Sequence, residues 1–354
     1  MDHPYSKQYL AMPEYASTRS DRFLIVTSIS APTDCMRALA AAAVENGFRF
    51  LCIGDLASPQ NYDLPGCEFL GIRDQVETGL AYAAVAPTKH YARKNIGYLV
   101  AAQRGAGVML ETDDDNAPQN GFWDSPSDTL VNRRVRKFAE SGWSNVYGAF
   151  GSSAWPRGYP LQSIGREQAA CVPVAVDPEK ILVKQGLVSG DPDVDAIFRL
   201  TQKTLPDFDD ADPVWFGRHA WTPFNSQNTW WHRLALPLMY LPATCSFRAT
   251  DIIRGYVALR CLWELDSGVL YTGVTAHQIR NEHDLMKDFE QEIELYTNTR
   301  ALVETLEALP LATGPEKLVQ NMRSAYRALV EFGAVSEREL SLLDAWLQDV
   351  VSLS

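Results

Sequence analysis

The chain lacks several sequence signatures that would assign it to a common class of protein. Its six cysteines contain no C-x-x-C pair, which argues against a zinc site and favours reduced, structural thiols. No G-x-G-x-x-G motif follows the first apolar run and no G-x-x-x-x-G-K-S/T motif occurs, so a dinucleotide oxidoreductase and a P-loop NTPase fit poorly. Neither a signal peptide nor an apolar run of membrane-spanning length is recognisable. We therefore expect a cytoplasmic protein, with peripheral attachment at the inner membrane surface left open.

The chain also has fewer basic than acidic residues. It contains 32 lysines and arginines and 44 aspartates and glutamates, which gives a net charge of −12. Binding to nucleic acid depends largely on basic side chains that neutralise phosphates, so a nucleic-acid partner is not expected. A local basic pocket for a diphosphate remains compatible with this balance. Apolar material is plentiful, at 46% of 354 residues, which is enough for a large core.

Short apolar, β-branched runs alternate with helical segments in the first third of the chain. We expect strands at residues 23–29, 48–53, 67–72 and 107–110, and helices at 33–46 and 94–103. This rhythm is typical of a Rossmann-type α/β sheet flanked by helices. Ligands of such sheets bind beyond the carboxyl ends of the strands, so polar residues at those ends are the first candidates for a site.

A cluster of carboxylates, Glu111-Thr112-Asp113-Asp114-Asp115-Asn116, follows the last of these strands directly. In an extended chain successive side chains alternate, so Asp113 and Asp115 would share one side and Asp114 the other. Two hard oxygen donors on one side suit Mg²⁺ or Mn²⁺, which complete their coordination with water and substrate phosphates. The competing interpretation is a solvated acidic loop.

Four other polar residues fall near the ends of predicted strands or at a helix start. Thr27 and Asp55 end the first two strands, where they would hold a base and a ribose or simply cap the loops that follow. Arg93 and Lys94 come at the start of the helix at 94–103, where they would face phosphates and base carbonyls or, alternatively, solvent. These residues are candidates for nucleotide binding.

The middle of the chain, from residue 143 to 271, is aromatic and rich in turns, and its elements are hard to assign. Arg157 lies between a proline and a glycine, where its guanidinium would clamp a phosphate or carboxylate or form a salt bridge within a turn. Asn225, Gln227 and Asn228 form an amide cluster among aromatic residues. This combination suits sugar recognition, although aromatic side chains alone are more often part of a core.

Beyond residue 280 the sequence becomes helical in character. Residues 281–309 are amphipathic, and a second helix is expected to open at Pro315 and to end at Gly333. Ser336 and Glu339 predict a capping box at the start of a third helix. We expect these helices to pack on the rest of the chain or on a partner subunit, so a homodimer is left open.

Six segments, taken in order along the chain, resemble the STELLO-type glycosyltransferase family. They are residues 95–102, 111–116, 157–161, 224–229, 246–252 and 280–284. The resemblance runs from about residue 23 to about residue 292, which is most of the chain. A weaker resemblance, to the reversibly glycosylated polypeptides (the UDP-arabinopyranose mutases), rests on the aspartate triplet and on Arg157-Gly158-Tyr159-Pro160 with a second arginine at Arg166.

Both resemblances imply a GT-A fold, a nucleotide-diphosphate sugar donor, expected to be a UDP-sugar, and Mn²⁺ or Mg²⁺. In this family pattern Asp113 and Asp115 form the metal-binding DXD motif. Asp114 would contact the ribose or a metal-bound water. GT-A enzymes often use a late histidine as a third ligand to the metal, and His277, or in second place His283, would match it.

The resemblance also implies roles on the acceptor side. Asp251 falls where GT-A enzymes carry the carboxylate that binds or deprotonates the acceptor hydroxyl. The rival interpretation is an N-cap for a helix that begins at Ile252. Arg157 or Arg166 would match the arginines implicated in sugar attachment in the mutases, although a guanidinium is a poor nucleophile unless strongly activated.

The predicted function is metal-dependent transfer of a sugar from a nucleotide-diphosphate donor to a glycan or lipid-linked acceptor. The predicted domains are an N-terminal extension (1–20), a catalytic domain (21–280, with a nucleotide-sugar-binding half at 21–142 and an acceptor half at 143–280) and a C-terminal helical region (281–354). A UDP-sugar pyranose–furanose mutase and a non-catalytic GT-A-fold scaffold are the alternatives. The donor sugar, the acceptor and the stereochemical outcome are not fixed by these patterns.

Overall fold

The computed structural model describes residues 21–280 and 284–353. The predicted extension at residues 1–20 and His283, the second candidate for a late metal ligand, lie outside the described residues. Within the described part of the chain, no helix has the length and apolar character needed to cross a membrane.

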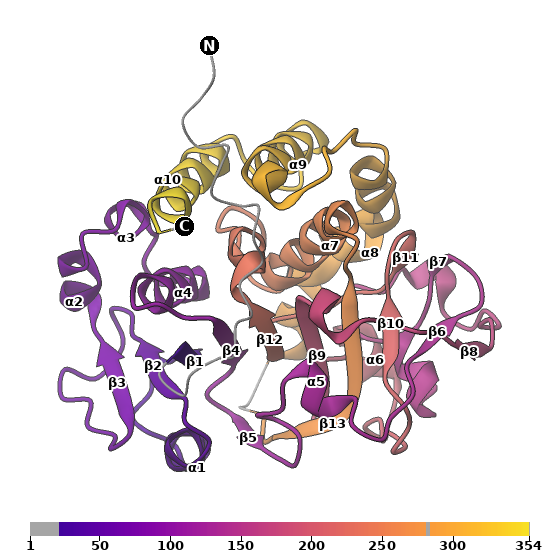
Figure 1. Cartoon of the computed structure of the whole chain (residues 1–354), viewed down its shortest axis with the longest axis horizontal. Helices are drawn as coiled ribbons and strands as arrows, with labels where there is room; N and C mark the ends of the chain where they lie inside the picture. The colour runs from indigo at the N-terminus through magenta and orange to yellow at the C-terminus, as the bar shows by residue number, and fades with distance from the viewer. Residues whose placement is uncertain (1–20, 281–283, 354) are drawn as a thin grey trace.

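Among the described residues, a sheet of 11 strands runs through the molecule (Figure 1). Its strands lie in the order β3 (Cys67–Leu70), β2 (Arg49–Ile53), β1 (Arg22–Thr27), β4 (Val108–Thr112), β12 (Asn228–His232), β9 (Val183–Gly190), β13 (Val269–Gln278), β10 (Val214–Phe216), β6 (Arg136–Phe138) and β8 (Cys171–Pro173), with β5 (Asn116–Pro118) paired to β13. A separate pair is formed by β7 (Gly142–Trp143) and β11 (Ala220–Trp221). The first four strands of the order are parallel, whereas β12 is antiparallel to both β4 and β9. The sheet is therefore mixed.

Helices surround this sheet, and the C-terminal ones collect on one side of the molecule. They are α1 (Asp34–Glu45), α2 (Ile72–Glu77), α3 (Ala81–Val85), α4 (Lys94–Gln103), α5 (Pro126–Thr129), α6 (Ala196–Thr201), α7 (Thr250–Leu262), α8 (Leu285–Glu307), α9 (Leu318–Phe332) and α10 (Arg338–Ser352). Figure 1 shows α9 and α10, in yellow, above α4 and α7, with α1 at the opposite end of the view. The predicted Rossmann-type mixed sheet flanked by helices, with a C-terminal helical extension, is confirmed.

The N-terminal strands and helices form where the sequence predicts them, for local reasons. β1 lies between two parallel neighbours and is buried from Phe23 to Val26, which explains its continuous apolar run. α1 begins where the Thr33 hydroxyl accepts a hydrogen bond from the Met36 amide at 3.1 Å. α4 packs closely on β1, because a Cβ atom at Gly97 would lie 2.6 Å from Cγ2 of Ile25.

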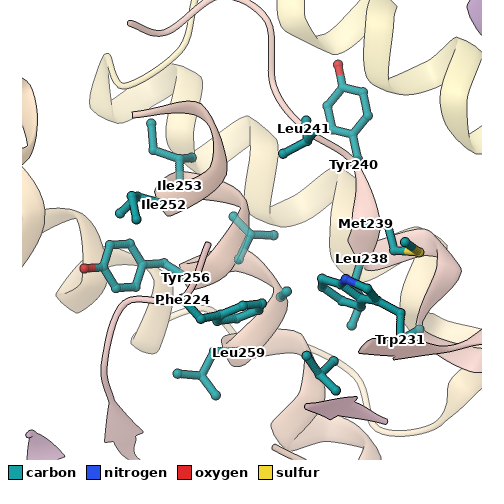
Figure 2. Packing of buried hydrophobic residues seen from close by; sticks show 14 of the residues in the cluster. Phe224, Trp231, Leu238, Met239, Tyr240, Leu241, Ile252, Ile253, Tyr256 and Leu259 are labelled. Atoms are coloured by element: carbon teal, nitrogen blue, oxygen red, sulfur yellow. The ribbon is translucent and has the colours of Figure 1, made fainter. Parts of the chain in front are cut away.

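The buried helix α7 forms the centre of the apolar core. Every residue from Thr250 to Leu262 is buried. Figure 2 shows Tyr256 of this helix beside Phe224, which comes from the segment leading into β12. The ring of Phe224 lies 5.8 Å, between centroids, from that of Trp231 in β12. Burial of each such large side chain contributes about 1.5–3 kcal/mol, so the first turn of α7 is held firmly in place.

The C-terminal helices pack on the body of their own chain. The Asp349 carboxylate of α10 accepts hydrogen bonds from the backbone amides of Ala81 and Tyr82 at 2.9 and 2.8 Å, and so caps the start of α3. α9 ends at Gly333, which has a φ of 88°, as the sequence predicts.

The capping box predicted for α10 is wrong. Glu339 is fully buried, and its carboxylate accepts hydrogen bonds from the Tyr240 hydroxyl at 2.5 Å and the Thr244 amide at 2.8 Å. The residue preceding the helix is Glu337, whose side chain makes no capping bond. A glutamate that satisfies a distant loop is unavailable to cap its own helix.

Candidate functional site

A cavity of about 650 Å³ opens at the carboxyl ends of β1, β2 and β4. Residues that follow these strands contribute to its lining, namely Thr27, Ser28, Asp55, Asp113, Asp114 and Asp115. Later segments contribute Arg157, Asp193, Asn225, Gln227, Asp251 and Gln278. The structure therefore brings most of the predicted site residues to one cavity, at the edge of the sheet where ligands of α/β proteins bind.

The three aspartates do not alternate as an extended chain would. β4 ends at Thr112, and Asp114 and Asp115 form a turn, so all three carboxylates line the cavity. Lys94 donates to Oδ1 of Asp113 at 2.9 Å, and the Ser28 hydroxyl donates to Oδ2 of Asp114 at 2.6 Å. The predicted separation of Asp114 from its two neighbours is wrong, because the chain turns before the alternation can take effect.

Crowding of negative charge distinguishes Asp113 and Asp115. Burial raises the pKa of Asp115 to about 6, with the charge of Asp113 as the next cause. Burial also raises the pKa of Asp113, although Lys94 opposes the shift. Gln278 donates to Oδ2 of Asp115 at 2.9 Å and fixes its orientation. A cation between these two carboxylates would relieve both the repulsion and the desolvation.

The cationic pair at the start of α4 is engaged within the protein. The Lys94 ammonium is fully buried and donates to the Thr112 carbonyl at 2.8 Å, in addition to Asp113. The Arg93 guanidinium reaches the cavity lining but donates to Oε1 of Gln75 at 2.9 Å. Both side chains therefore brace the backbone around the site, in contrast to the predicted contacts with phosphates and base carbonyls.

The two predicted nucleotide-binding residues at the ends of β1 and β2 both line the cavity. Asp55 also organises its own loop, because its carboxylate accepts from the amides of Leu56 at 2.6 Å and His90 at 3.0 Å. Thr27 lies at the end of β1, beside Ser28, which holds Asp114. The capping alternative for Asp55 thus describes part of its role.

Arg157 joins two carboxylates that come from later segments of the chain, Asp193 and Asp251. Its Nε and Nη2 donate to the two oxygens of Asp193 at 2.8 Å, and its Nη1 and Nη2 donate to the two oxygens of Asp251 at 3.0 Å. The last N–H of Nη1 is taken by the backbone carbonyl of Arg248. All five N–H groups of Arg157 are therefore engaged. Burial would raise the pKa of Asp193, but Arg157 and Arg248 outweigh it and hold the pKa well below its usual range.

Asp251 does not cap a helix. It lies in the first turn of α7, which begins at Thr250, and its carboxylate accepts from Arg157 and from the Ser226 amide at 3.3 Å. The rival interpretation, an N-cap for a helix beginning at Ile252, is wrong, because the helix starts two residues earlier.

Two of the three predicted amides line the cavity. Asn225 donates to Oδ2 of Asp193 at 2.7 Å, and Gln227 donates to Oε1 of Gln278 at 2.7 Å. Asn228 belongs to β12 and donates to Oγ1 of Thr275 at 2.7 Å, inside the sheet. Its side chain links β12 to β13 across the intervening strand β9 and does not belong to the cavity lining.

His277 and Arg166 also lie away from the cavity lining. His277 is in β13, and its Nδ1 lies 3.1 Å from Oγ of Ser189. The next residue, Gln278, contacts Asp115; adjacent residues of a strand face opposite sides, so His277 is directed away from the aspartates. Arg166 lies exposed in a loop.

Sequence reasoning missed Asp193, Gln278 and three arginines of the cavity lining, Arg199, Arg248 and Arg280. Gln278 is next to the predicted His277. Because adjacent residues of a strand face opposite sides, the alternation along this strand was the signal that could have pointed to Gln278 in place of His277. Asp193 follows β9 in an Asp-Pro-Asp turn, a strand-end signal like that of Asp55. Arg248 and Arg280 lie in the segments 246–252 and 280–284 of the family resemblance, whereas Arg199 lies in none of the six.

Metal binding has to be judged from the donors present. Among the described residues, no three His, Cys, Asp or Glu side chains are arranged to hold a metal ion. Mg²⁺ and Mn²⁺, however, are commonly bound by one or two carboxylates together with substrate phosphates and water. Asp113 and Asp115 fit this second arrangement, a cation shared with a bound diphosphate, and do not fit a site made by the protein alone.

Comparison with known proteins gives two curated relatives from Arabidopsis thaliana. The chain is 31% identical to "Probable glycosyltransferase STELLO1" over 358 residues, which cover 96% of this chain and 45% of the relative. It is 30% identical to "Probable glycosyltransferase STELLO2" over 354 residues, with 95% and 45% coverage. The chain thus spans a little under half the length of these relatives. No protein-family model matches it.

Among solved structures, the glucosyl-3-phosphoglycerate synthase of M. tuberculosis aligns with 81% of this chain and 79% of its own. The TM-score is 0.36 and the sequence identity 10%, which is a loose likeness.

Proposed function

The chain belongs, over nearly its whole length, with the STELLO-type glycosyltransferases, and from this relationship we propose that it is a metal-dependent glycosyltransferase that uses a nucleotide-diphosphate sugar, with UDP as the expected nucleotide. The observation that carries the proposal is the pair Asp113 and Asp115, two crowded carboxylates that line a cavity of about 650 Å³. A cavity of this size is in the range of small-molecule and cofactor sites.

On the donor side, Asp113 and Asp115 would hold the cation, which when bound would offset the charge that develops on the leaving diphosphate. Lys94 keeps one oxygen of Asp113 in place, and Gln278 does the same for Asp115. Thr27 and Asp55 would contact the base and the ribose from the ends of β1 and β2.

On the acceptor side, Asp251 would bind the acceptor hydroxyl and accept its proton. Arg157 is a positioning residue in this scheme, because it holds Asp251 and Asp193 at fixed separation and has no N–H left for a substrate. Asn225 and Gln227 would bind sugar hydroxyls in the same cavity.

The mutase alternative needs an arginine that can take up a sugar. Arg157 is saturated by hydrogen bonds, and Arg166 lies exposed outside the cavity lining. These placements favour transfer to a separate acceptor.

A thermal-shift experiment with UDP, with and without Mn²⁺, tests the proposal. Ligands that bind only the folded state raise its melting temperature. At a ligand concentration of a hundred times Kd, the free energy of unfolding rises by about 2.7 kcal/mol. We expect a shift with UDP and Mn²⁺ together that is larger than the sum of the separate shifts, and its loss in Asp113→Asn. Asp344→Asn, which alters an exposed ion pair, is the matched control and should keep the shift. If UDP and Mn²⁺ together leave the melting temperature of the wild-type protein unchanged, the proposal is overturned and a non-catalytic scaffold is favoured.

A further inference from the structure

Three arginines that the proposed transfer does not use line the same cavity. They are Arg199 on α6, Arg248 just before α7 and Arg280 just after β13. Their side chains are only 7%, 12% and 9% exposed, respectively. Three guanidinium groups from three separate segments, converging on one cavity, call for a reason beyond local packing.

Each of the three is held by a carboxylate. Arg199 pairs with Asp191, Arg248 with Glu292 at 2.7 Å, and Arg280 with Asp288 at 2.8 Å. The formal charges of these six side chains cancel, so any attraction for an anion must come from the N–H groups that remain available and from their closeness to one another.

Hydrogen-bond donors do remain, in contrast to the saturated Arg157. Within the described residues, Nε of Arg199 and Nη2 of Arg248 are buried without a hydrogen-bond acceptor. Nη2 of Arg248 lies within ion-pair distance of Glu292, but the aligned hydrogen bond to that carboxylate comes from its Nε at 2.8 Å. Both nitrogens are withdrawn from solvent, so the acceptor oxygen of a ligand would reach them only when the two side chains turn toward the cavity, and satisfying a buried donor is worth about 1–3 kcal/mol.

The three charges also repel one another. Burial lowers the pKa of Arg280 to about 10, and the next causes are the charges of Arg199 and Arg248, which outweigh the opposing carboxylates. The charges that shift the pKa of Asp115, by contrast, are those of Asp113 and Asp114. The largest charge effects on Arg280 therefore come from the other two arginines, and those on Asp115 come from the neighbouring aspartates.

We propose that Arg199, Arg248 and Arg280 bind a phosphate group carried by the acceptor, so that the acceptor is a phosphorylated sugar or a lipid-linked sugar phosphate. Guanidinium groups fork onto phosphate oxygens and are well suited to this task. The backbone carbonyl of Arg248 accepts from Arg157, which holds Asp251, so the phosphate would lie next to the carboxylate that is proposed to receive the acceptor hydroxyl. The identity of this ligand as an acceptor rests on the proposed function, whereas the anion site itself does not.

The test is phosphate binding in the absence of divalent metal. Inorganic phosphate is titrated in the presence of chelator, at constant ionic strength with chloride, and followed by calorimetry. We expect wild-type protein to bind phosphate at millimolar concentration, and Arg280→Gln to bind it at least tenfold more weakly. Arg323→Gln, which alters an exposed pair with Asp344, is the matched control and should bind like wild type. Should Arg280→Gln not fold, Arg280→Lys keeps the charge, loses the fork and should show a smaller loss.

Three results would overturn the proposal: no phosphate binding by wild type, equal binding by Arg280→Gln, or loss of phosphate binding on saturation with UDP and Mn²⁺, which would place the phosphate in the donor site. Competition by glucose 1-phosphate or by dodecyl phosphate in micelles would support it, and the stronger competitor would separate a soluble acceptor from a lipid-linked one. Phosphate binding without any response to UDP and Mn²⁺ would keep this site and reject the proposed glycosyl transfer.

Discussion

Replacing Asp115 with asparagine is expected to stabilise the protein above pH 6 while removing its metal-dependent response to UDP. In the folded protein burial, and then the charge of Asp113, raise the pKa of Asp115 from 3.8 to about 6. The folded state therefore keeps a proton that the unfolded chain releases near pH 4. Stability linked to this proton is complete below pH 4, is lost as the pH rises to about 6, and stays lost above it.

The size of the effect follows from the shift. Two pKa units correspond to about 3 kcal/mol, and because Asp115 is partly exposed we halve this for solvent screening, to about 1–2 kcal/mol. Asparagine carries no charge and does not incur this cost, and it can still accept the hydrogen bond from Gln278. For a chain of this length the gain corresponds to a rise of about 2 °C in melting temperature.

The assay is urea unfolding of wild type and Asp115→Asn in chelator at pH 4 and pH 8, with Asp344→Asn as a surface control. The variant should be the more stable protein at pH 8, and the difference should vanish at pH 4. A variant that is less stable than wild type at pH 8, or equally stabilised at both pH values, would refute the claim that the carboxylate is held under electrostatic strain.

Three further substitutions test how the site is supported, each by urea unfolding at neutral pH. Glu111→Ala leaves the buried guanidinium of Arg254 without the carboxylate that lies 2.8 Å away, and should cost about 3–5 kcal/mol; a cost under 1 kcal/mol would contradict a buried ion pair. Gly97→Ala places a methyl group 2.6 Å from Ile25 and should cost about 1–3 kcal/mol, whereas unchanged stability would show that α4 can shift freely. Asp349→Ala removes the acceptor of two backbone amides at the start of α3 and should cost about 1–2 kcal/mol; no loss would argue against docking of α10 there.

Local signals made much of the fold predictable. The cap at Thr33 and the glycine at residue 333 mark helix boundaries that depend on neighbours in sequence. The strand-end rule places Thr27, Asp55 and the aspartates at one edge, because parallel strands end together. The short strands β6, β8 and β10 of the middle region have three residues each, too few to show a periodicity.

The rest depends on contacts between residues far apart in the sequence. Arg157 and Asp251 are 94 positions apart, and the residues around each of them do not indicate that the two form an ion pair. Glu339 has the sequence pattern of a capping box, yet the loop near Tyr240 uses its carboxylate. His277 and Gln278 are adjacent in β13 and face opposite sides of the sheet. The register shifts of β13 against β9 interrupt the alternation, so the sequence does not show which of the two faces the cavity.

The continuity of the sheet limits how a ligand can enter and leave the cavity. β4 carries the strand end that bears the aspartates, and it is hydrogen-bonded through β12 to β9 and the later strands of the sheet. The Glu111–Arg254 pair ties the same strand to α7. A hinge between the two walls of the cavity would have to break the strand pairing and this ion pair together, so a ligand has to enter and leave through the loops at the rim. Leu56 and Phe247, 58% and 50% exposed, lie on such loops and line the cavity, so a ligand that enters would pass beside them.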